Sequence, residues 1–447
     1  MIHKFTMFGT NIVVDVNSGA VHVLDDISYD ILDFYDKVPK EEIIKQFTSK
    51  YDKEDIIETL TELSELKKRG LLFSEDIYES YVPVWEKKSV VKAMCLHVSH
   101  DCNLRCRYCF ASTGNFGGER SIMSEDIGKK AIDYLIEKSG SRVNLEVDFF
   151  GGEPMLNFNT VRNVVEYARQ REKESAKNFR FTITTNGMLL NKEDREFINK
   201  NFYNIVLSID GRKDTNDQMR VRSDGTGCYD KILPVIKDIV KSRNQKNYYV
   251  RGTFTRKNLD FSKDVLHLAD EGFEQISIEP VVAAEGSGFD IREEDVPTVC
   301  AEYERLALEY VRRRKEGQFF NFFHFMIDLS QGPCVAKRLK GCGSGNEYLA
   351  VTPEGDVYPC HQFVGNPEFK LGNIMDGELN ERICKNFKEL NIYSKQECRN
   401  CWARFYCSGG CAANAFQFNG DIYTPYKIGC ELEKKRLECA LWIKTQR

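Results

Sequence analysis

The sequence has no long hydrophobic run. No window approaches the ~18 consecutive apolar residues that a membrane-spanning helix needs. The N-terminal stretch MIHKFTMFGTNIVVDV also lacks the apolar segment of a signal peptide. We therefore expect a cytoplasmic protein that does not enter a membrane.

The chain also lacks a strong excess of one charge. It has 63 Lys and Arg residues against 68 Asp and Glu residues, a formal net charge of −5 over 447 residues, and no basic run dominates. Binding to nucleic acid or to anionic lipid depends on clustered positive charge. The composition therefore predicts no nucleic-acid partner and no membrane partner.

Cysteine, in contrast, is abundant, with 16 residues in the chain. Disulfides are rare in a reducing cytoplasm, and a chain of this length has enough material for two or three domains with cores of their own. Metal ligation therefore accounts better for so many thiols.

The most informative motif is Cys102-x3-Cys106-x2-Cys109, within CNLRCRYCFASTGNFGG. Three thiolates are one ligand short of a closed metal site, so a four-iron cluster held by them would keep one iron open to a small chelating molecule. The alternative is a zinc site, which usually needs a second pair of ligands. His97 and His100 lie upstream and are available for that role.

Residues 1–84 contain no clustered cysteine and indicate a small α+β binding module. Residues 12–16 and 20–24 alternate around an Asn-Ser-Gly turn, which predicts a β-hairpin. Helical segments follow, and we expect Ser28 to cap the first of them. A strand at residues 71–73 would complete a winged-helix shape.

Between residue 93 and about residue 280, apolar strand segments alternate with helical segments. This alternation implies a parallel sheet, open or closed, with functional residues at the carboxyl ends of its strands. A long charged helix over about 292–316 would lead out of this domain. After a first strand that begins at Ala93, the expected strands are 144–150, 180–185, 205–210, 248–255 and 275–280.

From Cys334 onward, cysteines, glycines and turns prevail. We expect little of this segment to form a conventional core, because metal–thiolate bonds can order such a chain instead. The sequence therefore predicts three domains, at residues 1–84, 90–316 and 317–447.

The three-cysteine loop resembles the signature of the radical S-adenosylmethionine (AdoMet) enzymes. The resemblance continues at FFGGEP, residues 149–154, which match the family's GGEP segment. It implies an α/β fold with a partial (β/α)6 barrel. It also implies that Cys102, Cys106 and Cys109 hold a catalytic [4Fe-4S] cluster, whose open iron binds AdoMet.

The same resemblance implies which side chains contact AdoMet. Tyr108 stands at the position that packs near the adenine, and later contacts are expected at 185–187 and 208–211. Taken singly, these residues also fit ordinary structural roles, because Asp210 can cap a helix and Arg220 can be a surface charge. The implied cofactor-binding residues are Tyr108, Gly151, Gly152, Glu153, Ser208 and Arg220, with Glu279 as a further candidate.

The second cysteine set resembles the seven-cysteine SPASM domain of radical enzymes that modify peptides and proteins. By resemblance, one auxiliary [4Fe-4S] cluster is held by Cys398, Cys401, Cys407 and Cys430. Three ligands to the other are Cys342, Cys360 and Cys411. Cys334 is the candidate fourth ligand, and if it does not ligate, one iron is open to a substrate thiolate.

Over essentially its whole length, the chain closely resembles the maturases of SCIFF peptides (six cysteines in forty-five residues). This resemblance implies AdoMet and three [4Fe-4S] clusters as cofactors, and a 5′-deoxyadenosyl radical that initiates thioether crosslinks of the sactionine or ranthionine type. The implied partners are a cysteine-rich precursor peptide, whose leader the N-terminal winged-helix-like domain binds along a sheet edge, and a flavodoxin- or ferredoxin-type reductant.

Two alternatives come from other functional classes. One is a formylglycine-generating sulfatase maturase, which forms no crosslink. The sulfatase-maturing branch carries an aspartate proposed as a base directly after the cysteine that corresponds to Cys360, and His361 in its place disfavours this function. The other alternative is a non-enzymatic protein that binds several zinc ions.

Overall fold

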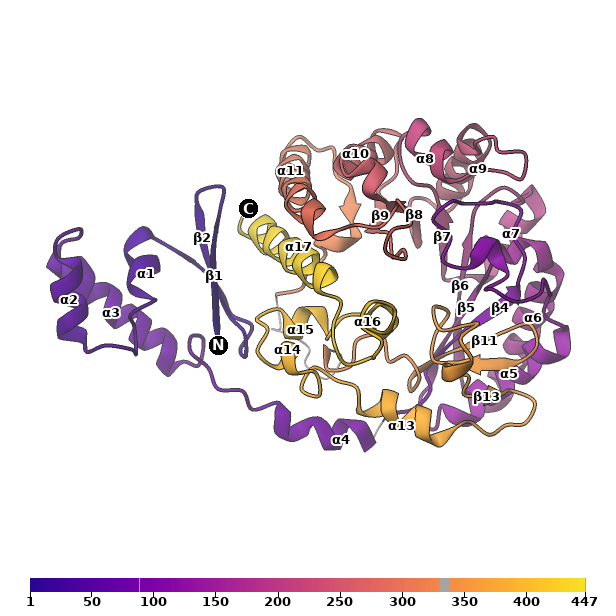
Figure 1. Ribbon diagram of the computed structural model, residues 1–447, viewed down its shortest axis with the longest axis horizontal. Coiled ribbons are helices and arrows are strands. Elements are labelled where there is room, and N and C mark those ends of the chain that lie inside the picture. Colours follow the sequence, from indigo (N-terminus) through magenta and orange to yellow (C-terminus); the bar gives the residue numbers. More distant parts are fainter. Residues whose placement is uncertain (88, 330–337, 447) are drawn as a thin grey trace.

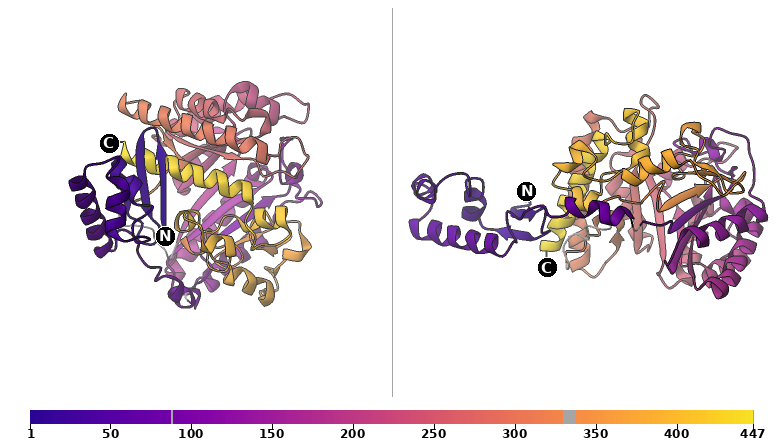
Figure 2. Two further views of the ribbon diagram at one scale, coloured as in Figure 1. Left: turned by 60° about the vertical axis from the view of Figure 1, so that its left-hand side comes forward. Right: turned by 90° about the horizontal axis from the view of Figure 1, so that it is seen from below.

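The computed structural model describes residues 1–87, 89–329 and 338–446 of the chain. It has a small N-terminal unit, a large curved sheet with helices on its outer face, and a cysteine-rich C-terminal region (Figures 1 and 2). Cys334 lies outside the described residues, so its expected role as a ligand stays a prediction.

The N-terminal unit begins with an antiparallel sheet in the order β1-β2-β3. The predicted hairpin is confirmed, since Val13 of β2 pairs with His22 of β3. The prediction of a strand at 71–73 is wrong, because that segment forms bends. The third strand of the sheet lies instead at the N-terminus, where none was predicted. The strands are β1 (Ile2–Met7), β2 (Thr10–Asp15) and β3 (Val21–Leu24).

Three helices follow and give this unit a core of its own. The cap of the first helix is Asp25 rather than Ser28, because the Asp25 carboxylate accepts the backbone N–H of Ser28 at 2.8 Å. Ile31, Ile56 and Leu60 are buried between the helices. The helices are α1 (Asp26–Ile31), α2 (Lys40–Phe47) and α3 (Lys53–Lys68).

The unit is attached to the C-terminal region through buried polar contacts. Arg404 donates hydrogen bonds to Asn17 at 2.6 Å and to Asp76 at 2.9 Å. The His3 ring of β1 stacks on Trp402, with ring centroids 3.8 Å apart. Strand β1 also packs against helix α17 (Lys427–Thr445), as Figures 1 and 2 show.

The second sheet has ten strands in the order β10-β9-β8-β7-β6-β5-β4-β11-β12-β13. All pairs from β10 to β11 are parallel, which confirms the predicted parallel sheet and each of its expected strands. The strands of this part are β4 (Ala93–Ser99), β5 (Asn144–Gly151), β6 (Asn178–Thr185), β7 (Asn204–Ser208), β8 (Tyr248–Phe254), β9 (Gln275–Pro280) and β10 (Asn321–Phe322).

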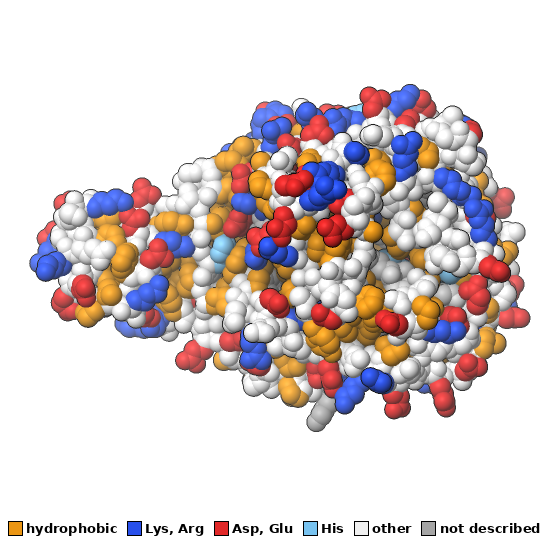
Figure 3. Space-filling model, viewed as in Figure 1, with side chains coloured by type: hydrophobic (Ala, Val, Ile, Leu, Met, Phe, Trp, Pro, Cys, Tyr) orange, Lys and Arg blue, Asp and Glu red, His pale blue; other side chains and the backbone are white. Residues whose placement is uncertain are grey.

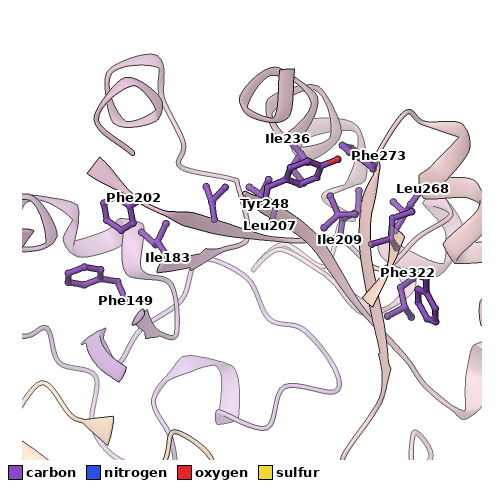
Figure 4. Close-up of a cluster of buried hydrophobic side chains, with 14 of the residues drawn as sticks. Phe149, Ile183, Phe202, Leu207, Ile209, Ile236, Tyr248, Leu268, Phe273 and Phe322 are labelled. Atoms are coloured by element: carbon purple, nitrogen blue, oxygen red, sulfur yellow. The ribbon is translucent and has the colours of Figure 1, made fainter. Parts of the chain in front are cut away.

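Alternate residues of these strands divide between two environments. On β5, Leu145, Val147 and Phe149 are fully buried, whereas the residues between them face the other side of the sheet. Figure 4 shows part of the apolar layer under the helices, including Phe149, Ile183 and Leu207. The helices are α5 (Glu125–Lys138), α6 (Phe158–Ser175), α7 (Lys192–Asn201), α8 (Lys213–Met219), α9 (Tyr229–Ser242), α10 (Phe261–Asp270) and α11 (Val296–Lys315).

The expectation that the C-terminal region forms little conventional core is wrong. Strand β11 (Tyr348–Val351) pairs in parallel with β4, and β12 (Asp356–Tyr358) and β13 (Gly372–Asn373) continue the same sheet. Helix α17 packs along α11 and buries apolar side chains there. These strands are short apolar segments that extend the sheet beyond β4. Because they are so short, they were not recognised as strands among the cysteines and turns.

None of the described helices is both long and apolar enough to cross a bilayer. Figure 3 shows acidic and basic side chains interspersed with apolar ones on the viewed face. The remaining short helices are α4 (Val82–Lys87), α13 (Glu381–Glu389), α14 (Gln396–Arg399), α15 (Arg404–Cys407) and α16 (Ala412–Asn419).

Candidate functional site

One cavity of about 260 Å³ opens at the carboxyl ends of the parallel strands. Because these ends share one edge of the sheet, residues that are far apart in sequence meet in its wall. The wall contains the three cluster cysteines and the candidate cofactor-binding residues: Cys102, Cys106, Tyr108, Cys109, Gly151, Gly152, Glu153, Ser208, Arg220 and Glu279. Gly187 and residues 209–211, which were also expected to contact AdoMet, do not line it, whereas Thr185 and Asn186 do.

The cysteine loop follows β4 and is held by backbone hydrogen bonds to the end of α8 and to the segment that follows this helix. Arg105 donates its N–H to Val221 at 2.7 Å, and Arg107 donates to Met219 at 2.9 Å. Burial raises the pKa of the Cys106 thiol to about 12, although the nearby Arg220 guanidinium opposes the shift. In the absence of a metal the Cys106 thiol stays protonated, so a cluster bound here would displace its proton.

Two glycines bring the end of β5 into direct contact with this loop. Gly152 donates its N–H to the Ser99 carbonyl at 2.8 Å, and Glu153 donates to the Asp101 carbonyl at the same distance. A Cβ on Gly152 would lie 2.2 Å from the Asp101 oxygen, and one on Gly151 would lie 2.2 Å from the Ser99 oxygen. Only glycine fits at either position, so the glycine pair fixes the loop as well as lining the cavity.

Glu153 is buried and held by three hydrogen bonds. Its carboxylate accepts from the Met155 N–H at 3.1 Å, the Thr185 hydroxyl at 2.7 Å and the Asn186 N–H at 2.8 Å. Burial raises its pKa to about 7 against the effect of these donors. Thr185 and Asn186, which were expected to contact AdoMet, therefore also position Glu153, and the Asn186 side chain donates to Asn103 in the cysteine loop at 2.8 Å.

Arg220 belongs to a buried polar cluster. Its Nε donates to Asp210 at 2.9 Å, and the Tyr108 hydroxyl donates to the same carboxylate at 2.8 Å. Asp210 is fully buried, and its charge raises the pKa of Arg220 although burial opposes this shift. A surface charge for Arg220 is wrong because the residue is buried, and a helix cap for Asp210 is wrong because Arg212 occupies the N-cap position of α8. Tyr108 and Arg220 are thus fixed in the cavity wall.

The cavity is also lined by groups that the sequence did not single out together, among them Arg251, Glu279 and His361. Arg251 on β8 forms an ion pair with Glu279 at 2.9 Å. Burial favours the neutral form of Glu279, but Arg251, His324 and Arg436 outweigh it and lower its pKa. The His361 ring lies 5.1 Å from the Phe150 ring, and burial lowers its pKa to about 4. Alternation along β8 is the sequence signal that could have placed Arg251 inside.

Seven cysteines of the C-terminal region form two groups, within which the thiols affect one another's pKa. Burial is the main cause of every shift. Beyond burial, Cys360 is affected by Cys342 and Cys411. The other group is Cys398, Cys401, Cys407 and Cys430. The two groups have the same members as the ligand sets that the sequence resemblance implied, and their role as ligands stays a prediction. They come from loops and short helices of the C-terminal region together with α17.

The donor set fits clusters better than single ions. Within the described ranges, no three His, Cys, Asp or Glu side chains converge closely enough to hold one metal ion. Thiolates of a four-iron cluster each bind a different iron, so they do not need to converge in this way. His97 and His100, the ligands that a zinc site would need, contact each other at 3.1 Å, and neither lines the cavity.

Two family models match the chain. One describes a 4Fe-4S single cluster domain and matches residues 92–233. The other is the SPASM iron-sulfur cluster-binding domain, which matches residues 342–402. The two matches cover the cysteine loop and most of the second cysteine set.

Curated relatives extend the similarity over about three quarters of the chain. The radical SAM cyclopropyl synthase TigE of Paramaledivibacter caminithermalis is 24% identical over 77% of this chain and 72% of its own. The cysteine-type anaerobic sulfatase-maturating enzyme of Clostridium novyi is 26% identical over 76% of this chain and 92% of its own.

A solved structure covers nearly all of the fold. Streptococcus suis SuiB bound to its precursor peptide SuiA matches 96% of this chain and 98% of its own, with a TM-score of 0.55 and 18% identity. SuiB has also been solved with bound S-adenosylmethionine. The likeness to SuiB shows a common fold. The two family models and the relatives show that the chain is similar to radical S-adenosylmethionine enzymes over about three quarters of its length and matches the SPASM domain in its C-terminal region.

Proposed function

We propose that the protein forms thioether crosslinks in a ribosomally made, cysteine-rich peptide, as the SCIFF maturases that it resembles do. The observation that carries the proposal is the composition of one cavity. Cys102, Cys106 and Cys109 line it, and so does His361, which directly follows Cys360, an auxiliary ligand in this proposal. A substrate in this cavity would lie between the radical-generating site and an auxiliary site.

The chain's own residues bind and orient the reactants. When bound, a reduced cluster with AdoMet supplies a 5′-deoxyadenosyl radical that removes a hydrogen atom from carbon, and an auxiliary cluster accepts the electron released when a substrate thiolate joins that carbon. Glu153 offers its remaining lone pairs to the methionine amino group, and Arg220 offers its guanidinium to the carboxylate. Ser208, at the end of β7, is placed for a ribose hydroxyl.

The part of the cavity lined by Phe110, Phe150 and His361 would hold the peptide. Phe110 and Phe150 surround the His361 ring, with Phe150 closer, so this part of the wall is apolar and aromatic. The Arg251–Glu279 pair beside it supplies a donor and an acceptor for polar groups of the peptide. His361 is neutral at neutral pH and can accept a hydrogen bond from a substrate thiol.

The leader of the peptide would bind at the N-terminal unit, residues 1–84. Strand β3 is an edge of its sheet, and Val23 on it is 58% exposed. An extended peptide can add to such an edge through backbone hydrogen bonds. The SuiB structure with its precursor peptide, which matches the chain including this unit, supports a peptide partner.

Three [4Fe-4S] clusters are part of the proposal, as is a flavodoxin- or ferredoxin-type reductant. Anaerobically reconstituted protein should therefore contain about twelve irons with matching sulfide. The triple variant C102A/C106A/C109A should contain about eight. Zinc without sulfide would reject the enzymatic function altogether.

The reaction is tested with a cysteine-rich precursor peptide encoded beside this protein, AdoMet and dithionite. We expect the peptide to lose two hydrogens per crosslink, and its cysteines to resist alkylation. A peptide that lacks its leader should react much more slowly. Conversion of cysteine to formylglycine would favour the sulfatase-maturase alternative, and unmodified peptide beside 5′-deoxyadenosine would contradict the proposal.

A further inference from the structure

Lys395 is a buried lysine at the centre of the auxiliary cysteine groups. Its side chain belongs to a residue that is only 2% exposed, and its Nζ donates to the Gly409 carbonyl at 2.7 Å. Gly409 lies between Cys407 and Cys411, which belong to different groups. Lys395 also directly precedes α14, which carries Cys398.

Buried lysines are rare, and those that stay charged are usually paired with a carboxylate. Lys395 has a different set of neighbours. Burial lowers its pKa, and the charges that oppose this effect most are four thiols: Cys398, Cys407, Cys411 and Cys430. No carboxylate of the described residues is among these leading charges. The Lys395 charge also lowers the pKa of Asp421, but less than the hydrogen bonds of that carboxylate do. As iron ligands, the cysteines of both auxiliary groups would be the leading anionic partners of this ammonium.

The side chain cannot easily turn away from this position. A Cβ on Gly409 would lie 3.6 Å from the Lys395 Cδ and 3.9 Å from its Cε, so the aliphatic stem runs along the Gly409 backbone. The Lys395 carbonyl also accepts the N–H of Arg399 at 3.0 Å, which anchors the residue to α14. The ammonium is thus held at a fixed place on the segment that joins Cys407 of one group to Cys411 of the other.

We infer that Lys395 is a cation shared by the two auxiliary clusters and that it raises the reduction potential of both. The inference rests on the cluster set of the proposed function. Reduction adds an electron to a cluster that its thiolates already make anionic, and net charge and solvent exposure set the potential of such clusters. A fixed cation shielded from solvent lowers the cost of that electron. The auxiliary clusters thereby become better electron acceptors for the crosslinking step.

The test measures reduction potentials in the C102A/C106A/C109A background, where only the auxiliary clusters remain. K395M, K395R and K385M are titrated with dithionite and followed by electron paramagnetic resonance. Lys385 is the matched control, because its side chain is 72% exposed and solvent screens its charge. We expect K395M to reduce the fraction of reduced cluster at a set potential at least tenfold, about 59 mV for one electron. K395R and K385M should stay near the parent value.

Unchanged potentials in a K395M protein that holds about eight irons would overturn the inference. An equal shift in K385M would overturn it too. If K395M binds less iron, the neutral K395Q is compared with the charged K395R. Equal reduction potentials in these two variants would also overturn the inference. The titration needs no peptide, so failed crosslinking with shifted potentials would remove the proposed function alone.

Discussion

Replacing Gly152 by alanine should remove the radical-generating site and leave the auxiliary sites intact. The new Cβ would lie 2.2 Å from the Asp101 carbonyl oxygen and 2.9 Å from the Gly114 Cα. Both contacts are with backbone, so no side chain can rotate to relieve them. The cysteine loop must withdraw from β5 by more than 1 Å to reach ordinary van der Waals contact.

That displacement sets the expected magnitude. A shift of about 1 Å in a positioned reacting group can cost about 10²-fold in rate, and overpacking of this kind costs about 1–3 kcal/mol of stability. We expect G152A to form 5′-deoxyadenosine at least about 100-fold more slowly than the wild type and to lose about four of its twelve irons. Iron analysis and chromatography of the nucleoside measure these two effects.

Gly118 provides the matched control. It lies in the same segment after the three cysteines, and its nearest contact to an added Cβ is the Asn115 carbonyl oxygen at 3.6 Å. G118A should therefore keep its iron content and its rate. If G152A kept twelve irons and cleaved AdoMet at the wild-type rate, the close approach of β5 to the loop would not be what fixes the site.

Three further predictions concern buried charges. R220M leaves the fully buried Asp210 without its cation, so it should lose about 3–5 kcal/mol of unfolding free energy and weaken AdoMet binding in calorimetry; R220M/D210N should recover stability but not binding. R404M should cost about 3 kcal/mol in denaturant unfolding, whereas R399M, which loses only an exposed pair, should cost less than about 1 kcal/mol; equal costs would contradict the buried anchor. Burial raises the pKa of Asp148 from 3.8 to about 7, so its contribution to stability is complete below pH 3.8 and is lost as the pH rises through 7. D148N should therefore flatten the dependence of the unfolding free energy on pH across this range. An unchanged pH dependence would refute the prediction.

The parallel sheet could be predicted because its signals are local. Each strand from 144 to 280 is an apolar segment followed by a helical one, and such alternation has one common solution. The cysteine groups were also accessible, since spacing within a motif survives in the sequence. Strands β11 to β13 were missed because they are two to four residues long, too short for a periodic pattern.

Many residues of the site could be predicted from the sequence, but their hydrogen-bond partners could not. Most of the expected AdoMet contacts lie in one cavity wall, yet Thr185 and Asn186 turn out to hold Glu153, and Asp210 holds both Arg220 and Tyr108. Such relations depend on which strands are neighbours and on how far each side chain reaches. A sequence motif names the residue types, and only the packed sheet decides which donor meets which acceptor.

The pairing of β11 with β4 and β12, which was not predicted, explains why the cavity is lined by the loop with Cys102 and also lies beside Cys360. The loop with Cys102 follows β4, and Cys360 follows β12, two residues after its last residue Tyr358. Strand β11 pairs with β4 in parallel and with β12 in an antiparallel ladder, so a continuous set of backbone hydrogen bonds links the two sites. A flexible linker between a barrel and a separate domain would leave their distance variable. Here the shared sheet fixes the distance between the loop with Cys102 and the segment with Cys360.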